Sequence, residues 1–424
     1  MLCNPLPLTL PLDIWGEIVQ HVYFEGDMDT LRSLSLCCRA LLPFCQRELF
    51  YSVLIPERVP EHATERDARI QELHQILSQS PHISNYVRIF TFFIALADVN
   101  NPIIREIVAR FTRIRFLELD HRDTTTNRLL DWDLFDEGFK GAFKDIIQLP
   151  HLESLDLATF TNVPTSTFLD LSQELEIINL NEVELKDDLK SPTPGLLRAS
   201  RSGRIPQPSL ITAMNGCGDI ISLLLNATPQ LVDFTKLDYI GIGWDKENIV
   251  AVVSRMLKAA PALEFLSCRG TNGTTIPFRG LANAISAANL KSLEQLEVMP
   301  ALTVLNTGPS DDLLWGLRDE VALLATKSKL KKFNIRFELY GSHFGLPTKL
   351  GELDSLFETK NFFPTLRKLS IQILVLVEDT RTVHERHTLR TELEQGCYDE
   401  CRRIQRTPGL VFDCDVSVET VHLG

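Results

Sequence analysis

The stretch Leu152-Glu153-Ser154-Leu155-Asp156-Leu157 carries three leucines at the spacing apolar-x-x-apolar-x-apolar. The last two leucines are two residues apart, so on a β-strand their side chains point to the same face of a sheet. We assign seven further repeats along the chain from this spacing. These instances are Val87-x-x-Phe90-x-Phe92, Ile114-x-x-Leu117-x-Leu119, Leu175-x-x-Ile178-x-Leu180, Leu263-x-x-Leu266-x-Cys268, Leu293-x-x-Leu296-x-Val298, Leu330-x-x-Phe333-x-Ile335 and Leu366-x-x-Leu369-x-Ile371. Self-similarity of this kind predicts a stacked-repeat architecture.

The repeats are irregularly spaced. A ninth instance, Leu231-x-x-Phe234, is degenerate because Lys236 occupies its third position. The middle residues of successive instances are 23 to 56 residues apart. We expect the widest gap, between Ile178 and Phe234, to contain one unrecognised repeat or a long loop around residues 192–208.

Helix-like segments separate the repeats. They cover residues 103–111, 219–226, 249–259, 281–287, 313–325 and 353–357, and a further apolar stripe from Leu389 through Cys397 and Cys401 predicts a helix near the carboxyl end. A last strand or cap is expected around Val411. Alternating helices and strands that cannot bury their apolar faces alone must stack, which predicts an α/β solenoid.

Residues 9–55 have a different pattern. Ile14, Ile18 and Val22 recur every four residues, which predicts one amphipathic helix. Asp29 is a suitable N-cap for a second helix, and Pro43 would end it and begin a third segment. Three such short helices can build only a small core, so we expect apolar surface to remain for a partner or for the next domain.

Composition narrows the class of protein. The 424 residues include 43 Lys and Arg against 56 Asp and Glu, giving a net charge of −13, which argues against nucleic acid as a partner. No apolar run approaches the roughly 18 residues that a membrane span needs, and no signal peptide is recognisable. Nine cysteines without a spaced framework suit reduced thiols, so the expected compartment is the cytoplasm or the nucleus.

The amino-terminal segment resembles an F-box, particularly that of fungal F-box proteins. The resemblance rests on Leu10-Pro11-Leu12-Asp13-Ile14-Trp15-Gly16-Glu17-Ile18, on residues 29–43 with their Cys38-Arg39 pair, and on the closing Leu49-Phe50. The leading Leu-Pro, the acidic residue, the Cys-Arg pair and the Leu-Phe follow the family order. It covers about 47 of the 424 residues. Leu41 is a departure, because the family usually has Trp or Phe there, which weakens the contact expected at that position.

The resemblance implies a domain organisation and a function. Residues 1–56 would be an F-box domain that docks on the Skp-family adaptor of an SCF-type cullin-RING ubiquitin ligase. Residues 57–424 would be a leucine-rich-repeat-like solenoid, with a C-terminal helix and cap, that binds a target protein of unknown identity. The chain would be the non-catalytic substrate-recognition subunit. The adaptor contacts implied are Leu10, Pro11, Ile14, Ile18, Leu31, Leu34, Cys38 and Leu41.

Two other classes of protein stay open at this point. The helices could only cap the end of the solenoid in an interaction scaffold without a ligase role. A doubly wound α/β enzyme is the third interpretation, and it would need a polar pocket at the carboxyl ends of the strands.

Candidate chemical motifs are weak. His384-Glu385-Arg386-His387 lacks one residue of the spacing that a zinc-protease helix needs, and we expect Cys397 and Cys401 to be core thiols. Gly241-x-Gly243 lacks the further glycine of a dinucleotide loop. Trp132 and Phe135 lie among acidic residues that would suit a basic peptide, but the favoured interpretation places both rings in the core. We therefore predict no catalytic residue, no cofactor and no metal.

Overall fold

The repeats form parallel β-sheet backed by helices. The computed structural model describes residues 11–122, 128–186, 205–228, 230–244, 249–270, 278–288, 292–302, 316–327, 329–340, 346–358, 362–378 and 382–421. The chain divides into two units. Unit 1 comprises Met1–Asn179 and Val183–Pro206, and unit 2 comprises Leu180–Glu182 and Gln207–Gly424.

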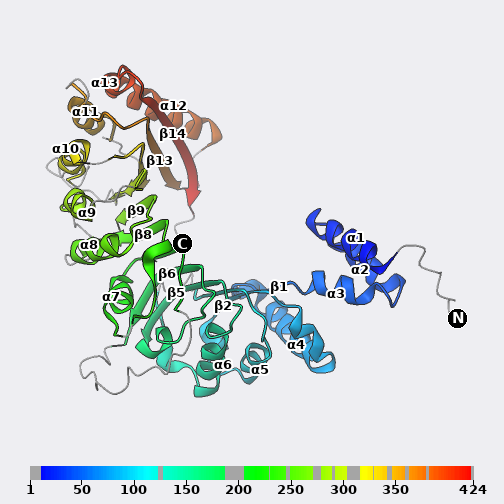
Figure 1. Cartoon of the computed structure of the whole chain (residues 1–424). Coiled ribbons are helices and arrows are strands. Elements are labelled where there is room, and N and C mark those ends of the chain that lie inside the picture. The colour runs from blue at the N-terminus through cyan, green and yellow to red at the C-terminus, as the bar shows by residue number, and fades with distance from the viewer. Residues whose placement is uncertain are drawn as a thin grey trace. The chain divides into compact units, whose positions relative to one another are not determined.

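Unit 1 begins with three helices and continues with strands in the order β1-β2-β3-β5-β6. Figure 1 shows α4, α5 and α6 following one another along these strands. The elements are α1 (Leu12–Phe24), α2 (Met28–Cys37), α3 (Leu42–Leu49), β1 (Ser52–Ile55), α4 (Ala63–Gln79), β2 (Ile89–Phe93), α5 (Pro102–Ala109), β3 (Phe116–Asp120), β4 (Leu130–Asp131), α6 (Glu137–Ile147), β5 (Ser154–Val163) and β6 (Ile177–Leu185).

Unit 2 has strands in the order β7-β8-β9-β10-β12-β13-β14, with helices α7 to α11 along one side of the strands (Figure 1). Its elements are β7 (Leu210–Met214), α7 (Gly218–Asn226), β8 (Tyr239–Trp244), α8 (Ile249–Ala259), β9 (Phe265–Gly270), α9 (Leu281–Ala288), β10 (Gln295–Met299), β11 (Ala301–Leu302), α10 (Leu317–Lys327), β12 (Lys332–Tyr340), α11 (Leu346–Leu356), β13 (Lys368–Glu378), α12 (Val383–Glu400), α13 (Arg402–Gln405) and β14 (Val411–Val421). The predicted alternation of helices and strands in a solenoid-like α/β architecture is confirmed.

The strand register follows the repeated spacing. The middle residue of each repeat lies opposite the middle residue of the next, as in Phe90 with Leu117 and Leu117 with Leu155. In unit 2 the same row runs through Leu266, Leu296 and Phe333. All six side chains are buried. Because a slip of one residue would turn each row toward the opposite face, burial of the row determines the register.

Two repeats differ from the expectation. The degenerate instance at Leu231-x-x-Phe234 is not a strand, because Phe234 begins a short 3-10 helix. The strand is β8, where Leu237-x-x-Ile240-x-Ile242 has the full spacing six residues later. Both segments are buried, but only the second has an apolar residue at all three positions, and this complete spacing is the signal that identifies the strand.

The gap between the fourth and fifth predicted repeats contains a repeat. Strand β7 lies there and pairs with β8, with Ile211 opposite Ile240. Its third inward position is the small Ala213, which is why the apolar pattern is faint. The alternative, a loop around residues 192–208, falls mostly outside the described residues.

The repeat sheet starts before the domain boundary expected after residue 56. β1 pairs in parallel with β2, and Val53 lies opposite Phe90 in the row described above. The repeat sheet therefore begins at Ser52, inside the predicted F-box domain. The helical region that precedes it, residues 12–49, has a core of its own.

A buried ion pair joins α4 to the loops that follow β1 and β2. Arg66 donates to both carboxylate oxygens of Asp98, at 2.6 and 2.8 Å, and both side chains are 2% exposed. Arg66 also donates to the carbonyl oxygens of Pro56 and Phe93. Asp98 in turn accepts a hydrogen bond from the backbone N–H of Ala95. Every polar atom of the pair thus has a partner from a different segment.

Gly243 is required by a close approach between β8 and the end of β7. A Cβ atom at this position would lie 2.5 Å from the backbone nitrogen of Asn215. Gly241 and Gly243 both lie within β8, so Gly241-x-Gly243 is part of a strand packed against its neighbour.

We predict that Asp98→Asn lowers the free energy of unfolding by about 3–5 kcal/mol, because it leaves the Arg66 charge buried without a counter-ion. Urea denaturation followed by circular dichroism measures this change. The control is Glu65→Gln, which breaks the exposed pair with Arg69 and should cost less than about 1 kcal/mol. Equal midpoints for the two variants would contradict the assigned role.

We predict that Gly243→Ala lowers the free energy of unfolding by about 1–3 kcal/mol, because the added methyl group forces β7 and β8 apart. The matched control is Gly141→Ala in α6, where no described atom lies within 4 Å of the added Cβ. That change should stabilise by up to about 1 kcal/mol through helix propensity. Thermal melting of both variants, with opposite signs expected, checks the prediction.

Candidate protein-interaction surfaces

The amino-terminal helices fold around a small core. Val19, Leu31, Leu41 and Cys45 are buried together, and partly buried side chains such as Trp15 pack around them. Gly16 of α1 allows close packing on α3, because a Cβ atom there would lie 3.1 Å from the ring of Phe44.

The helix boundaries differ from the expected ones. The N-cap of α2 is Asp27, whose carboxylate accepts a hydrogen bond from the N–H of Thr30 at 2.9 Å, and Asp29 lies in the first turn. The helix ends at Cys37 because Cys38 is extended, with φ −154° and ψ 134°. Pro43 then lies in the first turn of α3, where its missing N–H costs nothing.

The eight residues expected to contact an adaptor differ in how far they are exposed. Leu31 and Leu41 are 0% and 3% exposed, so they are core residues with no surface to offer a partner. Pro11 and Ile14 are exposed, and Ile14 retains 37% of its surface. The half-buried members are Ile18, Leu34 and Cys38, while Leu10 lies outside the described residues.

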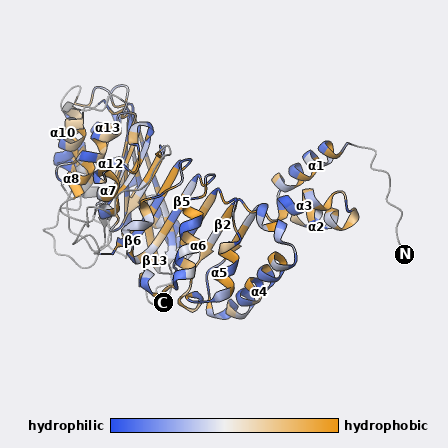
Figure 2. Cartoon of the chain, turned by 60° about the horizontal axis from the view of Figure 1, so that its bottom comes forward, coloured by the Kyte–Doolittle hydropathy of each residue, from blue (hydrophilic) through white to orange (hydrophobic). Residues whose placement is uncertain are grey.

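Three exposed apolar side chains were not anticipated from the helical spacing. Leu12, Phe24 and Leu36 are 50%, 73% and 87% exposed. Figure 2 shows hydrophobic positions between hydrophilic ones along these helices. None of the three belongs to the apolar stripe of Ile14, Ile18 and Val22. Exposed leucines on so small a helical unit are the feature that suits a partner.

Carboxylates on neighbouring strands form a second feature, in unit 1. Glu118 of β3 lies directly opposite Asp156 of β5 in the sheet register. Thr91 donates to Glu118 at 3.0 Å, and Asn179 donates to Asp156 at 3.5 Å. Asp120, two residues beyond Glu118, is held at 2.7 Å by Arg122. Each of the three carboxylates, Glu118, Asp156 and Asp120, therefore accepts at least one hydrogen bond from a neighbouring side chain.

The pKa of Asp156 is perturbed by this setting. Burial raises it to about 6, and the nearby negative charges of Glu118 and Asp120 add to the rise. The hydrogen bond from Asn179 and the charge of Arg122 act in the opposite direction. The ionised form of Asp156 is thus disfavoured in the folded state.

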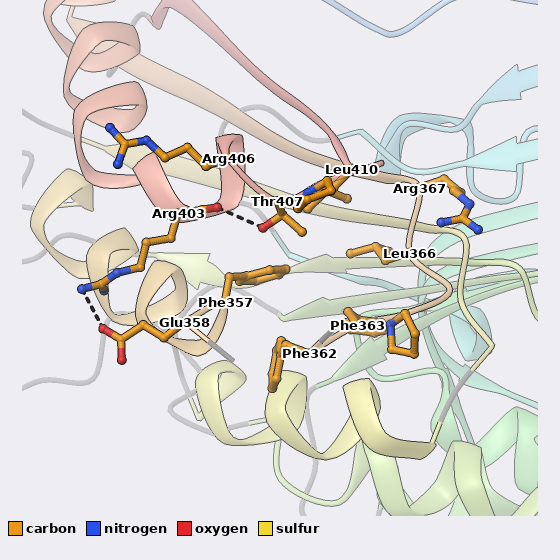
Figure 3. Close-up of a pocket in the computed structure, with 12 residues that line it drawn as sticks. Phe357, Glu358, Phe362, Phe363, Leu366, Arg367, Arg403, Arg406, Thr407 and Leu410 are labelled. Carbon is orange, nitrogen blue, oxygen red and sulfur yellow. Dashed lines mark hydrogen bonds and ion pairs between the residues drawn. The ribbon is translucent and has the colours of Figure 1, made fainter. Parts of the chain in front are cut away.

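A cavity of about 590 Å³ is the third feature, in unit 2. It lies between the segment that leads from α11 to β13 and the segment that leads from α13 to β14 (Figure 3). Its lining residues are Phe357, Glu358, Phe362, Phe363, Pro364, Leu366, Arg367, Arg403, Arg406, Thr407, Pro408 and Leu410. A volume of this size is in the range of ligand sites.

Two cysteines and two aromatic residues that were expected in the core are buried there. Cys397 and Cys401 are both 0% exposed, and burial raises the pKa of Cys401 to about 12, which disfavours its thiolate. Trp132 and Phe135 are also buried, with Phe135 stacked on Phe139 at 4.6 Å between ring centroids. These four expectations of burial are confirmed.

Across the described ranges, no group of three or more His, Cys, Asp or Glu side chains is arranged to hold a metal ion. His384 and His387 are exposed on α12. Within the same ranges, no helix is both long enough and apolar enough to cross a bilayer.

Comparisons with known proteins add little to this picture. No family model and no curated protein matches the chain. One similar solved structure is described as the crystal structure of a TLR13–ssRNA13 complex, with 12% identity and a TM-score of 0.29. The match covers 80% of this chain and 43% of that one. At this level of similarity the repeat architecture rests on the strand order and register given above.

We predict that Asp156→Asn stabilises unit 1 at pH 7 by on the order of 1 kcal/mol, after allowance for solvent screening. Between pH 4 and about 6 the unfolded chain loses the Asp156 proton before the folded chain does. The wild type therefore loses stability as pH rises through this window, and the variant should lack that loss. Urea midpoints from pH 4 to 7 measure it, and Asp145→Asn, at an exposed position, is the control. Identical pH profiles for wild type and Asp156→Asn would contradict the perturbed pKa.

Proposed function

We propose that the chain is the non-catalytic substrate-recognition subunit of an SCF-type ubiquitin ligase, acting in the cytoplasm or nucleus. In this proposal α1 to α3 dock on the Skp-family adaptor and the repeats bind the target protein. One observation carries it. A helical unit with its own core leaves apolar side chains exposed, at the place where the sequence resembles an F-box.

The energetics are compatible with such a docking. Burying one large apolar side chain contributes roughly 1.5–3 kcal/mol, and association costs roughly 4–15 kcal/mol. Leu12, Ile14 and Leu36 are already partly buried, so together they would contribute only about 3–5 kcal/mol, near the lower end of that cost. The remaining surfaces of Pro11 and of the half-buried Ile18 would therefore have to take part.

The scaffold interpretation makes a different prediction about the same helices. If they only cap the solenoid, their exposed leucines bind no adaptor, and the target-binding role of the repeats is unaffected. Binding to a purified Skp-family adaptor therefore separates the two functions.

We predict that the full chain retains the purified adaptor in a pull-down and that Ile14→Asp with Leu36→Asp weakens this binding at least tenfold. Each new carboxylate would have to be desolvated at the interface. Both positions are exposed in the free chain, so circular dichroism should stay native.

The control for this experiment carries the same charges elsewhere. Leu96→Asp with Leu134→Asp changes two leucines that are 63% and 47% exposed outside α1 to α3, and it should bind the adaptor as the wild type does. A wild-type chain that captures no adaptor removes the ligase role and leaves the scaffold.

A further inference from the structure

The cavity in unit 2 has an apolar middle. Phe363 and Leu366 are buried in its wall, and Phe357 and Leu410 are half-buried beside them. The ring of Phe362 lies edge-on to that of Phe357, with centroids 5.3 Å apart. Such a lining offers contact to a large apolar side chain.

Positive charge surrounds this middle. Figure 3 shows Arg403 and Arg406, from the α13 segment, on one side and Arg367 on the other. Arg403 is paired with Glu358 at 2.7 Å. In the described part of the chain, neither Arg367 nor Arg406 has a side-chain ion pair or hydrogen bond. Two free guanidinium groups are therefore presented to solvent.

This local charge opposes that of the whole protein. The net charge is −13, yet the cavity lining has three arginines and one carboxylate. The net negative charge of the protein repels anionic ligands at long range. Attraction of an anion to this cavity must therefore come from short-range pairing with the arginines of its lining.

The arrangement of the charges distinguishes between anions. A single phosphate or carboxylate group reaches only one side of the apolar middle. A ligand that satisfies both sides needs an apolar group at its centre and negative charges on either side of it. A peptide segment with one large apolar residue between acidic residues has that pattern.

We infer that this cavity binds an acidic peptide segment in which a large apolar side chain is flanked by carboxylates. The apolar side chain lies against Phe357 and Phe362, and the flanking carboxylates pair with Arg367 and Arg406. That this cavity recognises the target protein of a ligase rests on the proposed function. Binding of the peptide to the cavity does not require the adaptor.

Fluorescence anisotropy with the full chain tests the inference. The probe is a fluorescein-labelled peptide with one phenylalanine between two pairs of glutamates. Two further probes replace the glutamates with lysines or the phenylalanine with glycine. We expect the first probe to bind at least about tenfold more tightly than either of the others, and more weakly as salt is raised.

Variants locate the binding. Arg406→Glu and Arg367→Glu should each weaken binding of the first probe at least about tenfold, because a new carboxylate repels it. The matched control is Arg279→Glu, an equal change of charge at an exposed position of unit 2 that should leave binding unchanged. Phe362→Ala should weaken binding about tenfold while its melting curve stays cooperative.

Three results would overturn the inference. In the first, the lysine and glutamate probes bind equally tightly. In the second, Arg406→Glu and Arg279→Glu weaken binding by the same factor. In the third, an equimolar amount of inorganic phosphate displaces the peptide. Since this assay contains no adaptor, its failure leaves the adaptor pull-down result standing, and the reverse also holds.

Discussion

The row of buried apolar residues that crosses the parallel strands is the constraint on which the repeats depend. Each strand buries its repeated residues only if the next strand is in register, as Leu296 is with Leu266 and Phe333. An isolated repeat has no such neighbour and exposes that side of its strand to water. Stacking therefore supplies the burial that local propensity cannot.

Buried carboxylates add a polar connection between neighbouring helices. Glu320, on α10, accepts hydrogen bonds from the backbone N–H groups of Gly280 and Ala282 at the start of α9. Asp354, on α11, does the same for Arg403 and Ile404 in α13. These N–H groups have no partner within their own helices, so a neighbouring helix satisfies them. The apolar row and these caps act together.

The amino-terminal helices divide their apolar residues between two uses. Leu31 and Leu41 hold the three helices together, and Ile14 and Leu36 remain at the surface. Mutating the first pair would unfold the unit, so only the second pair can report on a partner. The cavity of unit 2 is distinct in kind, because its apolar middle is combined with arginines.

The sequence by itself determined the alternation of helix and strand, the inward residues of eight repeats, and the burial of Trp132 and Cys397. These follow from local spacing, because side-chain direction repeats every two residues on a strand. The tertiary structure places the repeat at Leu237, whose spacing is complete, and not at Leu231, whose third position is Lys236. It also brought the segments around Arg367 and Arg406 together. Their sequence separation carries no signal of that proximity, which arises when neighbouring repeats pack.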